Sequence, residues 1–230
     1  MTKMSVLVVA AHPDDEVLGC GGTMARLADE GHAVHVLILA EGVTSRGQQR
    51  DREAKTPELL QLRRCTEAAN AILGSASVKT CGLPDNRLDS IDLLDVVKLV
   101  EDEIGRHRPQ LLFTHHGGDV NVDHRVAHDA VAAACRPQPG HPVRQLLFFE
   151  VASNTEWRPP GFVAGFLPNC FYDIERYLGR KLDALRAYST EIRPFPHPRS
   201  AEAVEHLARW RGATVGHRAA EAFVVGRIIA

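Results

Sequence analysis

The sequence predicts an α/β fold in which a mostly parallel sheet is flanked by helices. Short apolar runs rich in Val and Leu occur at Ser5–Ala11 and Ala33–Ala40, and such runs suit parallel strands that are covered on both faces. A glycine-containing segment and a helical segment, Thr23–Asp29, separate the two runs. Strand, turn, helix and strand in this order form a βαβ unit, and later apolar runs alternate with amphipathic patterns in the same way.

A polar cluster follows the first predicted strand at His12-Pro13-Asp14-Asp15-Glu16. Proline cannot donate to a sheet ladder, so the strand is expected to end here and the acids to lie in a loop. Gly19, Gly21 and Gly22 are expected to turn the backbone tightly before the helix. The carboxyl end of a parallel strand is where open α/β sheets bind ligands, so this cluster is a candidate site.

Crowded carboxylates repel one another unless a cation neutralises them, and His with Asp a few residues away is a common grip on a divalent metal. We therefore interpret His12 and Asp15 as two metal ligands, and Asp14, on the opposite side of the segment, as a base. The alternative is a helix N-terminus at which Asp14, Asp15 and Glu16 favour the helix dipole. The acids are denser than capping requires, which favours the metal.

The middle of the chain continues the alternation of strands and helices. Residues 42–57 are polar and charged, which predicts a loop over the carboxyl ends of the strands that could act as a lid. The elements expected next are a helix over Glu58–Leu73 that ends at Gly74, a strand over Val78–Leu83, and a turn at Pro84-Asp85-Asn86. A second helix is expected over Ile91–His107. Its apolar face carries Leu94, Val97, Val100 and Ile104, with Glu101 as the polar exception.

A second polar cluster follows the predicted strand Gln110–Thr114. Residues 115–124 contain three His and two Asp, and the helix Arg125–Cys135 comes directly after them. Two polar clusters at one edge of a sheet can face each other across a crevice. His128 lies one turn beyond His124 on the same face, and we assign it a supporting or structural role.

The last third of the chain predicts two strands, two helices and a rigid excursion. Proline-rich Pro194–Ser200 cannot be helical, and its His197 and Arg199 reach either the cleft or a subunit contact, although proline-flanked loops usually serve structure. The regular elements expected here are strands at Gln145–Val151 and Cys170–Ile174 and helices at Arg176–Tyr188 and Ala201–Arg211.

Composition narrows the class of protein. The chain has 230 residues, 44% of them hydrophobic and 24% charged, which fits a single domain over residues 1–230. A net charge of -2 argues against a nucleic-acid partner. The sequence contains neither a membrane-spanning apolar run nor a signal-peptide pattern. Its five cysteines lack CxxC spacing, so we expect a reducing, cytoplasmic location.

Three sets of residues resemble the PIG-L (LmbE-like) zinc deacetylase family. They are AHPDDE after the first strand, Asn121-Val122-Asp123-His124 after a later one, and PHPRS with Ala219-Ala220-Glu221-Ala222-Phe223 near the end. AHPDDE combined with a distant DH is specific, whereas the C-terminal matches are looser and indicate the bacterial branch. The resemblance covers essentially the whole chain. It implies a Rossmann-like, three-layer α/β/α fold and hydrolysis of an N-acetyl group on an amino sugar or glycoconjugate.

Position by position, the resemblance places the metal ligands on His12, Asp15 and His124 and the base on Asp14. It implies zinc as the cofactor, and another divalent ion such as Fe2+ would suit the same two-His, one-carboxylate set. The partners that it implies are a small acetylated amino sugar or glycoconjugate and further copies of the chain in a homo-oligomer. A family arginine falls on Arg63, with Arg64 as the alternative, where it would bind a substrate hydroxyl, a phosphate or the acetate product.

The implied mechanism is attack of zinc-bound water on the amide, with Asp14 taking a proton and returning it to the leaving amine. Several members carry a His at the position of Asn121, and Asn can donate a hydrogen bond but cannot deliver a proton. We expect Asn121 to contact the reacting carbonyl oxygen and His115 to contact substrate, with His115 or His116 as alternative acids. Asp123 is expected to orient a ligand or substrate group, or to cap the following helix.

Two other functions fit the same residues. A metallo-phosphoesterase would need two metals about 4 Å apart, and His115, His116 and Asp119 would have to supply the second set of ligands. A non-catalytic sugar- or metal-binding protein is the other alternative, against which the intact Asp14 weighs. Substrate specificity is expected to lie in residues 42–57 and 153–168.

Overall fold

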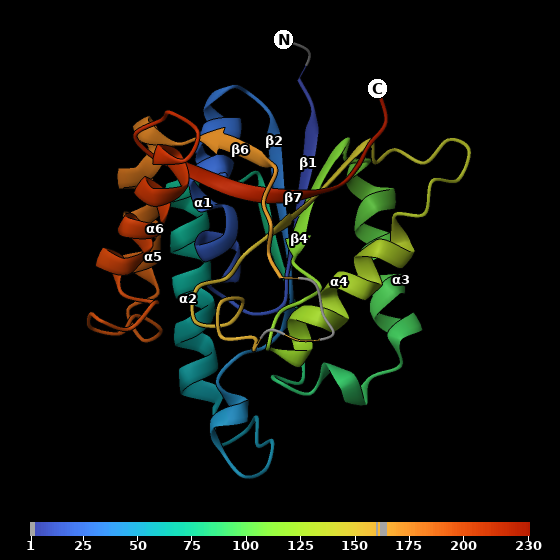
Figure 1. The fold of residues 1–230 in the computed structure, drawn as a ribbon. Helices are drawn as coiled ribbons and strands as arrows, with labels where there is room; N and C mark the ends of the chain where they lie inside the picture. Colours follow the sequence, from blue (N-terminus) through green and yellow to red (C-terminus); the bar gives the residue numbers. More distant parts are fainter. Residues whose placement is uncertain (1–2, 160, 162–164) are drawn as a thin grey trace.

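The strands form one seven-stranded sheet in the computed structural model, which describes residues 3–159, 161 and 165–230 (Figure 1). The strands are β1 (Ser5–Ala10), β2 (Ala33–Ala40), β3 (Ser77–Leu83), β4 (Leu111–His115), β5 (Gln145–Phe149), β6 (Cys170–Asp173) and β7 (Ala220–Ile228). The helices are α1 (Asp15–Asp29), α2 (Thr56–Leu73), α3 (Leu93–His107), α4 (Val122–Ala134), α5 (Leu178–Ala187) and α6 (Ala201–Ala213), with short 3₁₀ turns η1 (Thr44–Arg46), η2 (Leu88–Ser90) and η3 (Glu175–Tyr177).

The sheet is mostly parallel, as predicted. Its strand order is β3-β2-β1-β4-β5-β7-β6, and the pairs from β3 to β5 all run parallel. Strand β1 therefore lies between β2 and β4, so the two polar clusters predicted at strand ends are neighbours at one edge of the sheet. The parallel strands point their carboxyl ends toward the bottom of Figure 1, where the loop between β2 and α2 hangs below the sheet.

Strand β7 was not predicted from the sequence. It enters the sheet between β5 and β6 and runs antiparallel to both. Gly226 interrupts its apolar run, and a Cβ there would lie 2.6 Å from the ring of Phe148. Glycine inside a strand weakens its pattern in the sequence and marks a close approach of two neighbours. The C-terminal residues therefore complete the sheet as well as carrying the AEAF motif.

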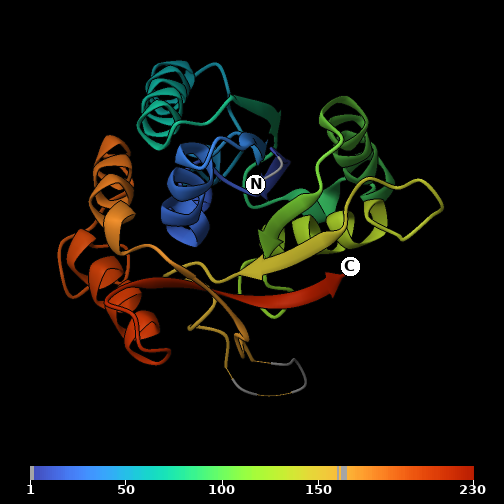
Figure 2. The same cartoon turned by 90° about the horizontal axis from the view of Figure 1, so that it is seen from above.

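Helices cover both faces of the sheet, which confirms the three-layer arrangement (Figure 2). Side chains alternate between the faces along β1. Val6 and Val8 join an apolar core under α1, α2, α5 and α6, whereas Leu7 and Val9 join a second core under α3 and α4. Burial on both faces explains why β1 and β2 are apolar without alternation.

The predicted glycine turn before the first helix was wrong. Helix α1 begins at Asp15, so Gly19, Gly21 and Gly22 all lie inside it. A Cβ on Gly19 would lie 2.3 Å from the ring of Phe149, and one on Gly22 would lie 2.7 Å from Cδ1 of Ile174. These glycines permit close packing of the helix against neighbouring elements, which is a different use of the missing side chain from a turn.

Other helix boundaries and faces also differ from expectation. Helices α2 and α4 begin two to three residues earlier than predicted, at Thr56 and Val122. On α3, Leu94 is 64% exposed, and the buried polar residue is Glu103 rather than Glu101. Glu103 accepts from Lys79 of β3 at 2.8 Å, so its burial is compensated by charge.

A buried ion pair repairs a break in α1, because it supplies the hydrogen bonds that are missing there. The backbone at Cys20 is non-helical (φ −147°), which leaves the N–H groups of Gly22 and Thr23 to donate to the Glu221 carboxylate. Lys181 of α5 donates to the carbonyl of Leu18, the group that Gly22 would reach in a regular helix, and also to Glu221. The pair thus joins α1, α5 and β7 through one set of hydrogen bonds.

Two further expectations from the sequence concern the specificity segment and the absence of a membrane-spanning helix. Residues 160 and 162–164, within the 153–168 segment expected to influence specificity, lie outside the described residues. Across the part of the chain that is described, none of the helices has the length and apolar character needed to cross a membrane.

Replacing Lys181 by alanine should destabilise the protein by about 3 to 5 kcal/mol, because Glu221 would keep a buried charge without its cation. Urea unfolding followed by circular dichroism measures the change. The control is Lys98→Ala, since Lys98 is 63% exposed and its pair with Glu101 is a surface contact worth about 0 to 1 kcal/mol. Equal stabilities for the two variants would contradict this account of the repair.

Candidate active site

The two polar clusters follow the carboxyl ends of β1 and β4 and therefore lie together at one edge of the sheet. His12 lies two residues beyond the end of β1, Asp15 is the first residue of α1, and His124 lies in the first turn of α4. One donor atom from each of these three side chains lies within 4.8 Å of the other two. The residues predicted as metal ligands are therefore brought together, although His124 is more than a hundred positions from the other two along the chain.

The cluster has the chemistry of a metal site. Oδ2 of Asp15 lies 3.2 Å from Nδ1 of His12 and 3.2 Å from Nε2 of His124. Asp15 and His124 are fully buried, and the His12 side chain is 11% exposed. Oδ1 of Asp15 and Nε2 of His124 have no hydrogen-bond partner among the described residues. Buried polar atoms are rarely left without partners, so these atoms fit a divalent cation.

Charges within the cluster support one another. Burial disfavours the charged form of His12, but hydrogen bonds to Asp123 and Asp15 outweigh it and raise the pKa of His12 to about 10. Burial acts to raise the pKa of Asp15, and His124 and His12 nevertheless hold it well below its usual range. A cation that binds here would replace the proton of His12 as the partner of the Asp15 carboxylate.

Acidic side chains lie behind both imidazoles. Nε2 of His12 lies 3.0 Å from Oδ2 of Asp123, whose other oxygen accepts from the backbone N–H of Leu88 at 2.9 Å. Nδ1 of His124 lies 3.1 Å from Oδ2 of Asp119. A carboxylate behind a histidine fixes which ring nitrogen faces the metal. Asp123 thus stands where the orienting role was predicted, and that role stays a prediction.

Asp14 is held in a strained backbone conformation beside the cluster. Its φ of 105° is rare for a residue with a side chain, and its N–H donates to Oε2 of Glu16 at 3.1 Å. Oδ2 accepts from Arg199, whereas Oδ1 has no hydrogen-bond partner among the described residues. Burial raises the pKa of Asp14 to about 7 against the opposing effect of Arg199, with Asp15 also raising it. That value suits a group that exchanges protons near neutrality.

Glu16, which holds the Asp14 backbone, is itself buried without a cation. Its Oε1 accepts from the Tyr188 hydroxyl at 2.6 Å and from the Asn70 amide at 3.0 Å. Burial raises the pKa of Glu16 to about 7, against the hydrogen bond from Tyr188. The sequence interpretation treated Glu16 only as a possible helix-dipole acid. Its partners come from α2 and from the end of α5, which no local pattern connects to it.

The expectation that the acids lie in a loop holds for Asp14 but was wrong for Asp15 and Glu16. Asp15 and Glu16 occupy the first turn of α1 and Asp14 its N-cap position. Carboxylates are favourable at this end of a helix. The same helix start also aims Asp15 at His12 and His124, because its Oδ2 accepts the His12 N–H at 2.8 Å. Asp15 thus lies both in the first turn of α1 and beside the two imidazoles.

A polar cavity of about 230 Å³ opens beside the cluster. His12 and Asp14 form part of its wall, together with residues of the β2–α2 loop and the segment before α6. Its other lining residues are Pro13, Gly42, Val43, Ser45, Arg46, Leu62, Asp85, Asn86, Asn121, Glu191, Arg193 and Arg199. The loop predicted as a possible lid therefore does border the site, through Gly42 to Arg46.

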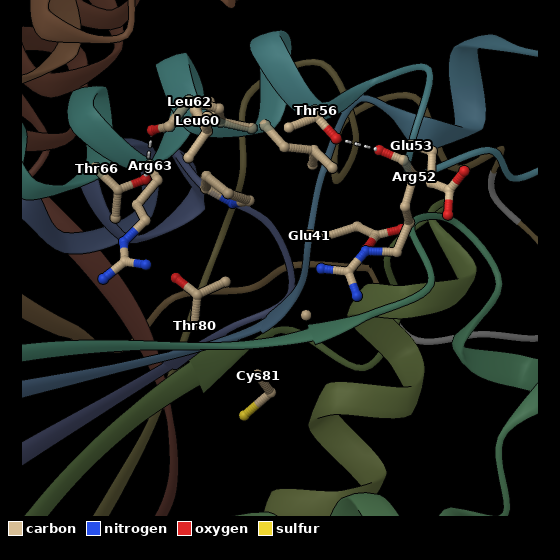
Figure 3. A pocket seen from close by; sticks show the side chains of 13 residues that line it. Glu41, Arg52, Glu53, Thr56, Leu60, Leu62, Arg63, Thr66, Thr80 and Cys81 are labelled. Carbon is tan, nitrogen blue, oxygen red and sulfur yellow. Dashed lines mark hydrogen bonds and ion pairs between the residues drawn. The ribbon is translucent and has the colours of Figure 1, made fainter.

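A larger hollow of about 430 Å³ lies between α2 and β3 and does not contain the cluster (Figure 3). Pro13 and Leu62 line both spaces. Arg63 lines this second hollow, pairs with Glu67 at 3.0 Å, and is 73% exposed. The structure thus does not bring Arg63 to the metal cluster, and its predicted contact with substrate remains a prediction.

His115 and Asn121 have other partners than substrate. His115 is fully buried, stacks on His124 with ring centroids 4.0 Å apart, and accepts the N–H of Ala11 at 2.8 Å. Burial and the neighbouring His124 hold the pKa of His115 well below its usual range. Asn121 caps α4 by accepting from the N–H of Asp123 and donates to Asn86 at 2.9 Å. The structure shows supporting contacts for both, and their predicted catalytic and substrate roles stay untested.

Arg199 and Asp85 both lie at the site, and for Arg199 the cleft was one of the two places that the sequence analysis gave it. Arg199 donates to Asp14 at 3.0 Å, and the PHPRS motif was the one signal that pointed to it. Asp85, predicted only as a turn residue, lies 3.5 Å from Nε2 of His12 and accepts from the N–H and hydroxyl of Ser45. The local sequence around a turn carboxylate does not predict which distant strand end the carboxylate faces.

His12, Asp85 and Asp123 form a second group whose atoms are close enough for a cation. Its carboxylates are already used, because Asp85 accepts from Ser45 and Asp123 accepts from Leu88 and contacts His12. Among the described residues, His115, His116 and Asp119 do not form the second ligand set that a metallo-phosphoesterase would require. This arrangement favours one ion over two.

Comparisons with known proteins identify a family and a fold. The model of the PIG-L family, GlcNAc-PI de-N-acetylase, matches residues 7–135. The uncharacterized deacetylase YaiS of Escherichia coli is 28% identical over 194 residues, which cover 82% of this chain and 92% of that protein. The diacetylchitobiose deacetylase of Thermococcus kodakarensis is 28% identical over 225 residues, covering 94% of this chain and 80% of that protein.

Among solved structures, the conserved protein TT1542 of Thermus thermophilus matches with a TM-score of 0.76 at 28% identity, covering 99% of this chain and 96% of that one. GalB of Pseudomonas putida, a 4-carboxy-2-hydroxymuconate hydratase, matches with a TM-score of 0.76 at 23% identity, covering 100% of this chain and 98% of that one. The second match is a likeness of fold alone.

Replacing His124 by alanine should weaken binding of a divalent ion by more than the roughly 10- to 100-fold that loss of an outer-shell partner costs. Metal content after dialysis against zinc, measured by mass spectrometry, reports the loss. Zinc should also raise the Tm of the wild type but not of the variant.

The control for this variant is His206→Ala, since His206 is exposed on α6 and away from the cluster. Equal zinc content in the two variants would remove His124 from the ligand set.

Proposed function

The chain belongs to the PIG-L family of GlcNAc-PI de-N-acetylases, and from this premise we propose that it is a metal-dependent hydrolase that removes the N-acetyl group from an amino sugar or glycoconjugate. The observation that carries the proposal is the cluster of His12, Asp15 and His124 beside Asp14. A zinc ion held by these three side chains would keep a coordination position open, as catalytic zinc sites do.

Zinc is the ion that we propose for this cluster. Two imidazole nitrogens and one carboxylate suit zinc, and the same donor set accepts Fe2+. The buried atoms of Asp15 and His124 that lack hydrogen-bond partners among the described residues support an ion at this place. When bound, such an ion lowers the pKa of a coordinated water to about 7 and polarises the acyl oxygen.

Asp14 performs the proton transfers in this proposal. Its Oδ1, which has no hydrogen-bond partner among the described residues, accepts a proton from the attacking water. The protonated carboxyl then donates to the nitrogen of the leaving amine. Asp123 keeps His12 oriented throughout, through the contact at 3.0 Å.

The proposed substrate class follows from the cavity and from the relatives. The cavity of about 230 Å³ is lined mostly by polar and charged side chains, which suits the hydroxyls of a sugar ring better than an apolar ligand. One relative is named for diacetylchitobiose and another for N-acetyl-alpha-D-glucosaminyl L-malate. We infer a small N-acetylated hexosamine or one of its conjugates as the substrate.

We also propose that the chain acts as a homo-oligomer. Large apolar side chains are exposed on the side of the molecule that carries α6, where Trp210 is 65% and Phe195 54% exposed. Burying such side chains against another copy would be favourable. Sedimentation velocity measures the assembly state, and a monomer at micromolar concentration would contradict this part of the proposal.

Acetate release from a panel of N-acetylated amino sugars and their conjugates tests the activity directly. The panel should contain N-acetylglucosamine, its chitobiose dimer, and conjugates with inositol and malate, with zinc-loaded protein in each assay. Release of acetate and a free amine in equal amounts supports the proposal. Release of phosphate from phosphorylated sugars without acetate release would favour the phosphoesterase instead.

Asp14→Asn should lower kcat by about 100- to 10,000-fold, because an amide cannot accept the proton that a carboxylate takes. Its zinc content should stay at the wild-type level, since Asp14 is not among the three proposed ligands. Steady-state rates and metal analysis on the same preparation measure both quantities.

The matched control is Asp129→Asn, a change of the same kind in α4. Asp129 does not line the cavity beside the cluster. Wild-type turnover in Asp14→Asn would show that another group accepts the proton.

A further inference from the structure

Arg199 comes from a part of the chain far from the motif that it serves. It lies in the proline-flanked segment between α5 and α6, and its side chain is 21% exposed at the cavity wall. Its Nη1 donates to Oδ2 of Asp14 at 3.0 Å. An arginine beside a buried carboxylate keeps its charge under all ordinary conditions, so this contact persists whenever Asp14 is ionised.

The guanidinium group is held on other edges as well. Nε donates to the Ser153 hydroxyl at 2.8 Å. The amide of Asn154, in the orientation that satisfies both of its polar atoms, accepts from Nη2 at 3.0 Å. Ser153 itself has a φ of 70°, so the backbone after β5 is bent to present these two side chains. Contacts through three different nitrogens fix the plane of the group.

Both the backbone and the side chain of Asp14 are therefore held by hydrogen bonds. Glu16 accepts its backbone N–H, and Arg199 occupies one of its two carboxylate oxygens. The other oxygen, Oδ1, is buried and has no partner within the described part of the chain. The two oxygens are chemically alike, so the contact with Arg199 determines which of them is available for a proton.

We propose that Arg199 is a positioning residue that holds Oδ2 of Asp14 and thereby makes Oδ1 the oxygen that accepts the proton from water. In this step the O–H bond of water breaks, its electron pair stays on the water oxygen, and a new O–H bond forms at Oδ1. The inference rests on the proposed function, in which Asp14 is the base. Arg199 does not touch the reacting atoms itself and acts through the carboxylate.

This role predicts a specific kinetic pattern. A base displaced by about 1 Å costs roughly 100-fold in rate, so Arg199→Ala should lower kcat by about 100-fold. KM should stay near the wild-type value, because the three nitrogens of Arg199 are engaged by Asp14, Ser153 and Asn154. Zinc content should be unchanged. The reactions are run with the panel member that gives the fastest acetate release.

The matched control is Arg211→Ala. Arg211 is also 21% exposed and also forms a close ion pair, with Glu150, but it makes no contact with Asp14. It should lose similar stability while keeping wild-type kcat. Added guanidinium ion should raise the kcat of Arg199→Ala and leave Arg211→Ala and the wild type unchanged, and Arg199→Lys should fall between the wild type and Arg199→Ala.

Two further measurements separate positioning from a general structural role. In an Asp14→Asn background, removing Arg199 should cost no additional kcat, because the group that it positions is already inactive. A crystal structure of metal-free Arg199→Ala should show the Asp14 carboxylate rotated or in several orientations. This readout needs no substrate, so it decides the inference even if every member of the panel fails and the proposed function falls.

The inference is overturned by any of four results. These are a wild-type kcat in Arg199→Ala, a loss expressed in KM rather than kcat, the same loss of kcat in Arg211→Ala, and an Asp14 carboxylate that keeps its orientation without Arg199.

Discussion

The burial of several carboxylates at the end of β1 is the constraint on which the rest of the site depends. Each ionised acid removed from water needs a partner, and each has a different one. His12 and His124 compensate Asp15, while Arg199 compensates Asp14. Glu16 is held by a tyrosine hydroxyl and an amide. These partners come from elements throughout the chain, so the charge at one strand end organises the packing of most of the molecule.

Much of the fold follows from local patterns. The apolar runs of β1 and β2 and the glycine stop of α2 were predicted almost to the residue, because burial on both faces and a left-handed cap leave clear signals. The predictions from the sequence were wrong where one residue type has two structural uses. Glycines in α1 serve close packing rather than a turn, and β7 was missed because Gly226 breaks its pattern.

For the site, the strand ends predicted that the polar clusters after β1 and β4 can face each other, since parallel neighbours end at the same edge. The family resemblance singled out His12, Asp15 and His124 among them. The positions of Arg199 and Asp85 relative to His12 and Asp14 are set by tertiary packing, and no spacing rule connects them. The division between ligands and their supports is likewise a property of geometry. Asp15 and Asp123 are both buried acids beside His12, and Asp15 also lies beside His124.

The repaired break in α1 has a consequence for how this protein can change over evolution. The segment matched by the family model ends at residue 135, yet the helix that carries Asp15 is completed by Lys181 and Glu221 from beyond it. The motif-bearing portion is therefore not a module that could be transplanted or inherited alone. Sequence changes in the C-terminal third are restrained, because residues there complete a helix near the start of the chain. Recombination between relatives would have to transfer both portions together.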